Sequence, residues 1–396
     1  MSTVHLRTTR ICHLLVASIA LVLFSTACAH LCGPRGTADE QPSRPLLAAA
    51  RAHKISLFGE IGRDDDVAYF TRAAVSLKRH TYTEVGGDND PDIDAGGRRI
   101  AFSSTRHSLN PDIYIKSVDG VAVTQLTSDP ASDVQPVFSP DGTRIAFASD
   151  RGGSWDIWVM EVDGGPPVRI TEGPADEVHP TWSPDGSKLA YCSLPAQSGQ
   201  WELWVTDVAM NSTKRFIGFG LFPEWSPQGD TILFQRARER DSRMFSIWTI
   251  TLVDGEPRYP TEVASSPDEA LTTPTWSPNA QQIAYTSIGG GPTDDRGRPS
   301  TDEKFDVWIM ASDGRERVRL TDGHTANYAP VFSTSGRLFF TTKRSGHDNI
   351  WSVLPASYAW GAAGNSSLTS NPRSGQMVTE IIEPASSQAV AADAGY

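Results

Sequence analysis

PTWSPDGSKLAY, from Pro180 to Tyr191, is the segment from which the architecture of this chain can be inferred. It reads as a strand, a tight turn and a second strand. Pro184 fixes φ in the turn, Asp185 accepts hydrogen bonds from nearby backbone N–H groups, and Gly186 takes a positive φ. Residues 188–192 then alternate apolar and polar side chains, as a half-buried strand does. The segment therefore predicts a β-hairpin.

Versions of this segment occur six times. They start at Pro91, Pro136, Pro180, Pro223, Pro274 and Pro330, at separations of 45, 44, 43, 51 and 56 residues. A second motif, ending in Tyr or Trp, follows each of them. These motifs are Asp112–Tyr114, Asp156–Trp158, Glu202–Trp204, Ser246–Trp248, Asp306–Trp308 and Asn349–Trp351. Eight of the eleven Trp residues fall at these two repeat positions, so the chain is built from repeated units.

Each unit reads as four strands, a to d. Strand a ends at the first aromatic position, strand b follows the Pro-Asp-Gly turn, strand c carries the second motif and strand d follows a further turn. Short strands at this spacing, without a helical period, predict four-stranded antiparallel sheets. A period near 44 residues with four strands per unit is typical of a β-propeller. The aromatic residues of strands a and c are then expected to fill the space between adjacent blades.

The Trp-Ser-Pro-Asp-Gly and Asp-Ile-Trp motifs resemble the TolB-type, WD-like propeller repeats of bacterial envelope proteins. The resemblance covers roughly residues 77–370 and implies an all-β, six-bladed propeller of four-stranded antiparallel blades around a central channel. TolB-type proteins typically join an N-terminal α/β domain to such a propeller. Too few residues lie between Cys28 and the first blade to hold that domain. Its contacts with the inner-membrane Tol machinery are therefore not carried over to this chain.

Two segments compete to close the ring. Residues 79–83 look like a strand d that could complete the last blade and remove an open sheet edge. Residues 367–370 also look like a strand d, because they resemble residues 125–128. The alternative architecture therefore has a seventh blade, built from residues 54–83 and 376–382.

The N-terminal residues predict export. Arg7 and Arg10 precede a mostly apolar stretch, residues 11–24, which has the length and basic flank of a secretory signal. Ser25-Thr26-Ala27-Cys28 resembles a bacterial lipobox, with Ser25 where the usual pattern has Leu. We expect residues 1–27 to be a signal peptide and Cys28 to be lipidated. Ala29, which is not Asp, points to the outer membrane in families sorted by that rule. Cleavage after Ala27 with free secretion is the alternative.

The rest of the chain divides by composition. Residues 28–53 read as a flexible tether, 54–370 as the propeller and 371–396 as a C-terminal tail. The formal net charge of −12 argues against nucleic acid as a partner, because nucleic-acid binding depends on Lys and Arg neutralising phosphates. The same composition excludes collagen, a coiled coil and a multi-pass membrane protein.

One face of the ring is predicted to carry the site. The b–c and d–a loops share this face, and irregular loops on a rigid scaffold are where binding residues concentrate. We call it the loop face. The predicted partner-binding residues at the channel mouth on this face are Asp88, Asp133, Glu177, His179 and Asn327. Three carboxylates here would form an electronegative ring. Calcium bound by that ring is an alternative, since calcium prefers oxygen ligands; otherwise no metal or cofactor is expected.

The b–c loop of the fourth unit holds a basic patch, of which Arg236, Arg240 and Arg243 are assigned to partner binding. Another set of arginines shares one repeat position and is expected to pair with the strand c carboxylates Asp112, Asp156 or Asp306. This set is Arg106, Arg151, Arg238 and Arg344. An insertion in the fifth unit, residues 289–304, could fold over the channel mouth.

Catalytic motifs are missing from the sequence. It contains no Gly-x-Ser-x-Gly, no His-Glu-x-x-His and no phosphate-binding Gly loop. We therefore expect a non-enzymatic, periplasmic propeller anchored to the outer membrane through lipid, which binds an envelope protein or peptide. By resemblance, the first partner to test is a peptidoglycan-associated lipoprotein or another Tol–Pal component. One alternative is an enzyme acting on an envelope sugar or peptide with channel-mouth residues. The other is the ligand-sensing module of a larger system.

Overall fold

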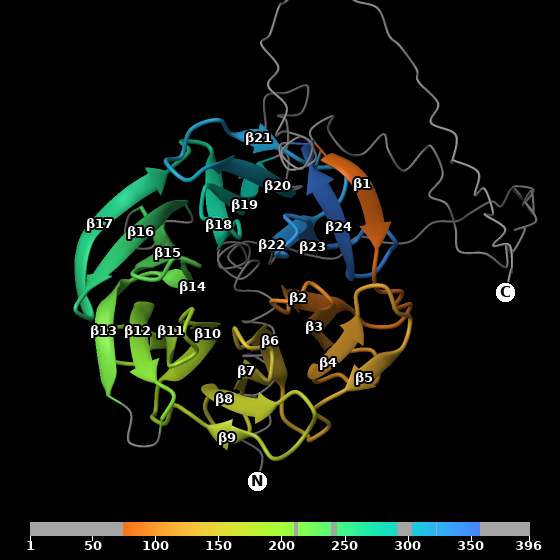
Figure 1. Ribbon diagram of the computed structural model, residues 1–396, viewed down its shortest axis with the longest axis horizontal. Coiled ribbons are helices and arrows are strands. Elements are labelled where there is room, and N and C mark those ends of the chain that lie inside the picture. Colours follow the sequence, from red (N-terminus) through yellow and green to blue (C-terminus); the bar gives the residue numbers. More distant parts are fainter. Residues whose placement is uncertain (1–73, 210–212, 239–243, 291–302, 322, 357–396) are drawn as a thin grey trace, which may run out of the picture.

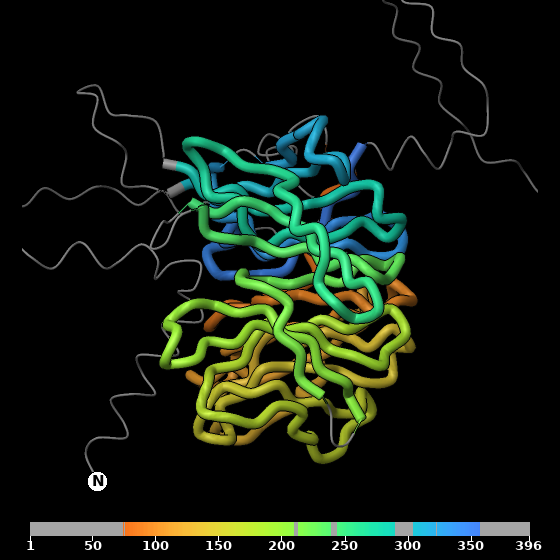
Figure 2. Tube along the Cα trace, turned by 90° about the vertical axis from the view of Figure 1, so that its left-hand side faces the viewer, coloured from red at the N-terminus to blue at the C-terminus, as the bar shows by residue number. Residues whose placement is uncertain are grey.

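The computed structural model describes residues 74–209, 213–238, 244–290, 303–321 and 323–356 of the 396-residue chain. These residues form six four-stranded antiparallel sheets that follow one another around a ring (Figure 1). The predicted all-β, six-bladed propeller is therefore confirmed. Seen from the side, the loops between strands lie on two opposite faces of the ring (Figure 2). Within these residues no helix has both the length and the apolar character needed to cross a membrane.

Within each blade the four strands follow one another from the innermost to the outermost position. Blades 1 to 3 are β2 (Asp88–Ile93), β3 (Arg99–Ser104), β4 (Asp112–Ser117) and β5 (Val123–Gln125); β6 (Asp133–Phe138), β7 (Arg144–Ser149), β8 (Asp156–Glu161) and β9 (Val168–Arg169); and β10 (Asp176–Trp182), β11 (Lys188–Leu194), β12 (Glu202–Asp207) and β13 (Lys214–Phe219). Blades 4 to 6 are β14 (Leu221–Trp225), β15 (Thr231–Ala237), β16 (Phe245–Val253) and β17 (Glu256–Ala264); β18 (Glu269–Trp276), β19 (Gln282–Gly290), β20 (Glu303–Ala311) and β21 (Val318–Arg319); and β22 (Asn327–Phe332), β23 (Leu338–Thr342), β24 (Asn349–Pro355) and β1 (Ala74–Arg79).

The ring is closed by β1, which pairs with β24 as the outermost strand of blade 6. Closure by an N-terminal strand d is therefore confirmed, although the strand occupies residues 74–79 rather than 79–83. Residues 74–79 belong to blade 6 and not to a seventh sheet. Residues 54–73, 367–370 and 376–382, which the seven-bladed alternative also used, lie outside the described part of the chain.

His80 continues this closure beyond β1. Its Nδ1 lies 3.1 Å from the carbonyl oxygen of Val118 in blade 1, and its Nε2 lies 2.8 Å from Ser352 Oγ in blade 6. A carbonyl oxygen can only accept, so Nδ1 carries the proton and Nε2 accepts from the serine hydroxyl. Burial lowers the pKa of His80 to about 4, which keeps the imidazole neutral at neutral pH. The neutral ring thus joins the first and last blades.

The turns form as the motif predicts. In blade 3, Asp185 Oδ1 accepts hydrogen bonds from Ser183 Oγ (2.6 Å) and the Ser187 backbone N–H (3.0 Å), and Gly186 has a φ of 69°. Hydrogen bonds to the charged carboxylate stabilise that form, so the pKa of Asp185 is lowered to about 2. The motif therefore sets the a–b hairpin locally.

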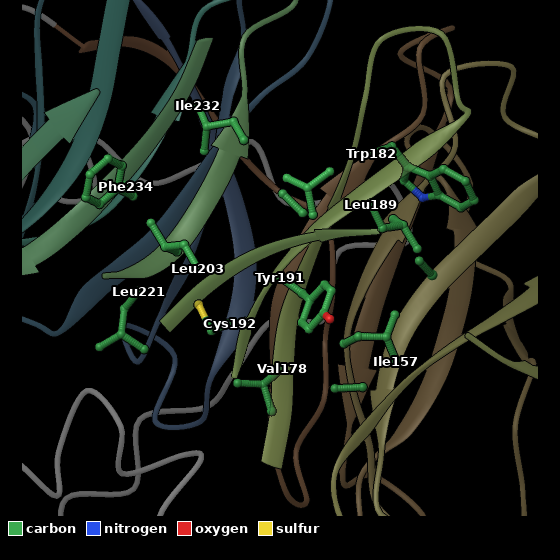
Figure 3. Packing of buried hydrophobic residues seen from close by; sticks show 14 of the residues in the cluster. Ile157, Val178, Trp182, Leu189, Tyr191, Cys192, Leu203, Leu221, Ile232 and Phe234 are labelled. Carbon is green, nitrogen blue, oxygen red and sulfur yellow. The ribbon is translucent and has the colours of Figure 1, made fainter. Parts of the chain in front are cut away.

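The core lies between neighbouring sheets. Figure 3 shows one such region, where Tyr191 and Cys192 of β11 lie among residues from blades 2, 3 and 4. Many of the largest fully buried side chains come from strand b, as Phe102, Phe147 and Tyr191 do. Strand c indoles such as Trp204 and Trp248 are only partly buried against this cluster. Strand b therefore supplies much of the bulk that we expected from strands a and c.

Candidate functional site

The six inner strands share an unusual backbone feature. Each has one residue in the left-handed region, with φ between 45° and 56°, where the pairing with strand b shifts register. These residues are Asp90, Gln135, His179, Phe222, Thr273 and Ala329. Left-handed φ costs roughly 1 kcal/mol or more for a residue other than glycine. The strain recurs in all six blades, so it belongs to the repeat and not to one site.

Side chains of the inner strands connect neighbouring blades. Gln135 Oε1 accepts a hydrogen bond from the backbone N–H of His179 in the next blade (2.9 Å). Asp92 Oδ2 accepts from the N–H of Phe138 (2.7 Å), and Glu224 Oε1 accepts from the N–H of Trp276 (3.0 Å). These polar groups satisfy buried backbone donors that the bulged strands leave unpaired.

Asp92 and Glu224 come from blades 1 and 4, which lie on opposite sides of the ring (Figure 1). Burial raises the pKa of Asp92 to about 7. Burial raises the pKa of Glu224 to about 8, and the negative charge of Asp92 adds to that shift. Neither residue could be predicted from the sequence, because a single acidic residue inside a short strand gives no distinctive pattern.

Glu224→Gln is expected to become more stabilising as the pH rises. Because the folded state holds the Glu224 proton up to about pH 8, the stability from this carboxyl is lost between its ordinary pKa of 4.5 and about 8. Gln keeps the Oε1 acceptor for Trp276 but does not titrate. The melting temperature of the variant minus that of the wild type should rise by roughly 5 °C between pH 5 and pH 9. Glu262→Gln, at an exposed position on β17, should show no such trend. If the difference in melting temperature between Glu224→Gln and the wild type stays constant with pH, the raised pKa of Glu224 is contradicted.

Asp88 and Asp133 lie at the start of β2 and β6 and are both fully buried. Arg106 Nη2 donates to both carboxylate oxygens of Asp88, at 2.8 and 2.9 Å. Arg151 Nη2 donates to both oxygens of Asp133, each at 2.8 Å. The expected pairing of these two arginines with strand c carboxylates is therefore wrong, because the b–c loop turns their guanidinium groups back toward strand a.

The strand c carboxylates have partners on strand d instead. Asp156 accepts from Arg169 Nη2 (2.7 Å), Asp306 pairs with Arg319, and Asp112 accepts from Gln125 Nε2 (3.1 Å). Each of these partners lies 13 residues after its carboxylate. The sequence holds this spacing, but it does not show which charge pairs with which.

Glu177 and Asn327 are also buried and bonded. Lys214 Nζ lies 3.3 Å from Glu177 Oε1, and the amide nitrogen of Asn327 donates to the carbonyl oxygen of Thr325 (2.6 Å). Burial raises the pKa of Glu177. The three carboxylates of the predicted ring are thus each bound to a cation and do not form an open anionic ring. Their assignment to partner binding remains a prediction.

His179 lies at the bulge of β10, and its ring centroid is 3.8 Å from that of Phe222. Its Nε2 has no hydrogen-bond partner among the described residues. Burial lowers the pKa of His179 to about 3, so the imidazole is neutral and a weak base. Within the described residues, no group of three or more His, Cys, Asp or Glu is placed to bind a metal ion.

Arg236 is the only described member of the basic site residues of the fourth unit. It is exposed at the end of β15, and its guanidinium carbon lies 5.1 Å from the ring centroid of Trp248. Arg240 and Arg243 lie outside the described residues, as does most of the insertion at 289–304. The assignment of all three arginines to partner binding remains a prediction.

Comparisons with known proteins support the fold and its type. Residues 70–251 match the family model described as PD40, TolB beta propeller domain. A protein of Agrobacterium tumefaciens assigned as a TolB has a solved structure with a TM-score of 0.50 at 18% identity, which covers 71% of this chain and 98% of that chain. An oligogalacturonate lyase of Vibrio parahaemolyticus gives a TM-score of 0.51 at 14% identity, covering 73% of this chain and 96% of that one. At such identities these structures show the fold alone.

Curated relatives also match, among them an uncharacterized protein of Agrobacterium fabrum. It is 32% identical over 79 residues, which is 20% of this chain and 23% of the relative. The match thus spans less than a quarter of that protein. The family model confirms the TolB-type propeller repeats within residues 70–251.

Proposed function

We propose that this TolB-type β-propeller is a non-enzymatic binding scaffold of the bacterial cell envelope that recognises a protein or peptide partner on its loop face. The match of residues 70–251 to the TolB beta propeller model is the observation that most supports this function. By the same resemblance, the first partner to test is a peptidoglycan-associated lipoprotein or another Tol–Pal component.

The geometry of the loop face is consistent with such a role. Buried ion pairs such as Arg106–Asp88 and Arg151–Asp133 connect the b–c loops to the inner strands. Loops fixed in this way present their exposed side chains in one arrangement, which lowers the entropic cost of binding. Leu109, in the b–c loop of blade 1, is 97% exposed and is well placed to report on a contact.

We place the protein at the outer membrane of the cell envelope. Residues 1–27 direct export, and Cys28 carries the lipid that holds the propeller at the outer membrane by its N-terminal tether. These residues lie outside the described part of the chain, and the proposal rests on their sequence.

A tagged full-length chain is expected to incorporate labelled palmitate through Cys28 and to retain the purified peptidoglycan-associated lipoprotein of the same organism. Leu109→Arg should reduce retention at least about fivefold, because it places a charge in the contact. Val121→Arg is the matched control, since Val121 is 88% exposed in the c–d turn of the same blade, on the opposite face.

Equal retention by both variants would exclude this part of the loop face. If Cys28→Ala still incorporates labelled palmitate, Cys28 is not the lipid anchor. Turnover in hydrolase or lyase screens of the purified chain would support the alternative of an enzyme acting on an envelope sugar or peptide.

A further inference from the structure

Blades 1 and 2 show how this repeat uses an arginine on the loop face. In blade 1, the guanidinium carbon of Arg106 lies 5.0 Å from the ring centroid of Tyr114 while the group donates to Asp88. In blade 2, the guanidinium carbon of Arg151 lies 5.1 Å from the ring centroid of Trp158 while the group donates to Asp133. The same arrangement therefore occurs twice: a cation over the strand c aromatic residue, bound to a carboxylate at the start of strand a.

Blade 4 keeps the cation and the aromatic residue. Arg236 lies over Trp248 at 5.1 Å, although it comes from the end of strand b itself rather than from the loop beyond it. No hydrogen bond or ion pair with another described residue engages its guanidinium group. Arg238 lies nearby in the chain and donates to the carbonyl oxygen of Ser266 (2.9 Å), so it adds a second positive charge.

Blade 4 lacks the carboxylate that blades 1 and 2 have at the start of strand a. Gly220 occupies the position of Asp88 and Asp133, three residues before the repeat proline. The equivalence is structural as well, because the backbone N–H of each donates to the carbonyl of the residue that precedes strand c in the previous blade, at 2.9 Å for Asp88, 2.8 Å for Asp133 and 3.1 Å for Gly220. A side chain cannot be restored at this position, since a Cβ on Gly220 would lie 2.5 Å from Cδ2 of Phe234 and 2.8 Å from the carbonyl oxygen of Gln235.

The second carboxylate position of the blade is neutral as well. Ser246 stands where blades 2 and 5 have Asp156 and Asp306, and it lies directly opposite Arg236 in the β15–β16 pairing. Its hydroxyl accepts from Trp248 Nε1 (2.8 Å). Among the described residues, neither Asp268 in the adjoining d–a loop nor Glu269 at the start of β18 forms an ion pair with Arg236. Blade 4 therefore presents a guanidinium group stacked on an indole. Neutral residues, Gly220 and Ser246, stand at the two positions where other blades have carboxylates.

We propose that Arg236 over Trp248 binds a carboxylate supplied by the partner, in the role that Asp88 and Asp133 fill within their own blades. The planar guanidinium group recognises a carboxylate through directed hydrogen bonds, and the indole beneath it holds the plane in place. On a chain of net charge −12, this cation also orients an acidic segment toward blade 4. This proposal rests on the proposed function in one respect, which is that the bound carboxylate belongs to a protein partner.

The test measures binding of a fluorescent hexaglutamate peptide, acetylated and amidated at its ends, to the full-length chain by fluorescence anisotropy at low salt. Arg236→Gln is expected to weaken binding about fivefold, the size of one exposed charge pair. Ser246→Asp should weaken it as much, because it places an internal carboxylate beside Arg236. Aspartate can also accept from the Trp248 indole, as Glu202 does from Trp204 (3.0 Å). Arg258→Gln is the matched control, because Arg258 is exposed on β17 of the same blade and lies over no aromatic ring of the described residues; it should bind as the wild type does.

Three results would overturn the proposal: unchanged binding by Arg236→Gln, equal weakening by Arg258→Gln, and displacement of the peptide by phosphate at a lower concentration than by glutarate. Retention of the peptidoglycan-associated lipoprotein separates this proposal from the proposed function. If the wild type and Arg236→Gln retain it equally, the carboxylate site fails and the scaffold function stands. If the wild type retains no envelope protein while peptide binding still depends on Arg236, the function fails and the site stands.

Discussion

A chain that begins at residue 80, and so lacks β1, is expected to melt about 10 °C below a chain that begins at residue 74. β1 pairs with β24 from Ala74 to Arg79, and its Leu77 packs against the core shared by blades 5 and 6. Arg337 also donates to the carbonyl oxygen and the hydroxyl of Ser76, at 2.7 and 2.9 Å, and would lose both acceptors. Without β1, blade 6 has three strands, and the outer edge of β24 is unpaired.

The two chains differ by six residues, so thermal unfolding followed by circular dichroism isolates the contribution of the strand. Light scattering should also show that the shorter chain associates as its concentration rises, because an open strand edge pairs with other strands. Equal melting temperatures would mean that the ring does not depend on this closure. A monomeric shorter chain with an unchanged transition would mean the same.

The fold could be predicted because its signals are local. Each a–b hairpin is set within about ten residues by a turn such as Ser183-Pro184-Asp185-Gly186, and the same signal recurs around the ring. The closing strand was displaced by five residues in the prediction, because Ala74–Arg79 has no adjoining turn motif and its partner is more than 270 residues away. Long-range pairing of this kind leaves little trace in one sequence.

The candidate site was less predictable, for a different physical reason. The sequence placed Asp88, Asp133 and Glu177 together on one face, but not the cations that neutralise them. Which carboxylate Arg151 reaches depends on how its loop turns, and that is set by packing against Phe147 and Trp158. The missing carboxylate of blade 4 is evident only from the strand register, because Arg236 lies two residues before the position that its repeat predicts.

Asp133→Ala is expected to lower the free energy of unfolding by about 3–5 kcal/mol, because it leaves the guanidinium group of Arg151, whose side chain is only 17% exposed, without its main partner. Urea or thermal unfolding of the purified chain measures this cost. Asp129→Ala is the matched control. Asp129 binds the same guanidinium group at 2.8 Å, but its side chain is 37% exposed, and its loss should cost less than about 1 kcal/mol.

Removing both charges distinguishes an ion pair from simple packing. Asp133→Ala combined with Arg151→Met should recover most of the lost stability, because no uncompensated charge stays buried. If Asp133→Ala costs no more than Asp129→Ala, the pair does not stabilise blade 2. The result also governs the choice of binding variants. A reversal such as Asp133→Arg would place two guanidinium groups against each other in a buried space. Any loss of partner binding would then follow from unfolding, whereas exposed positions such as Leu109 and Arg236 test the loop face itself.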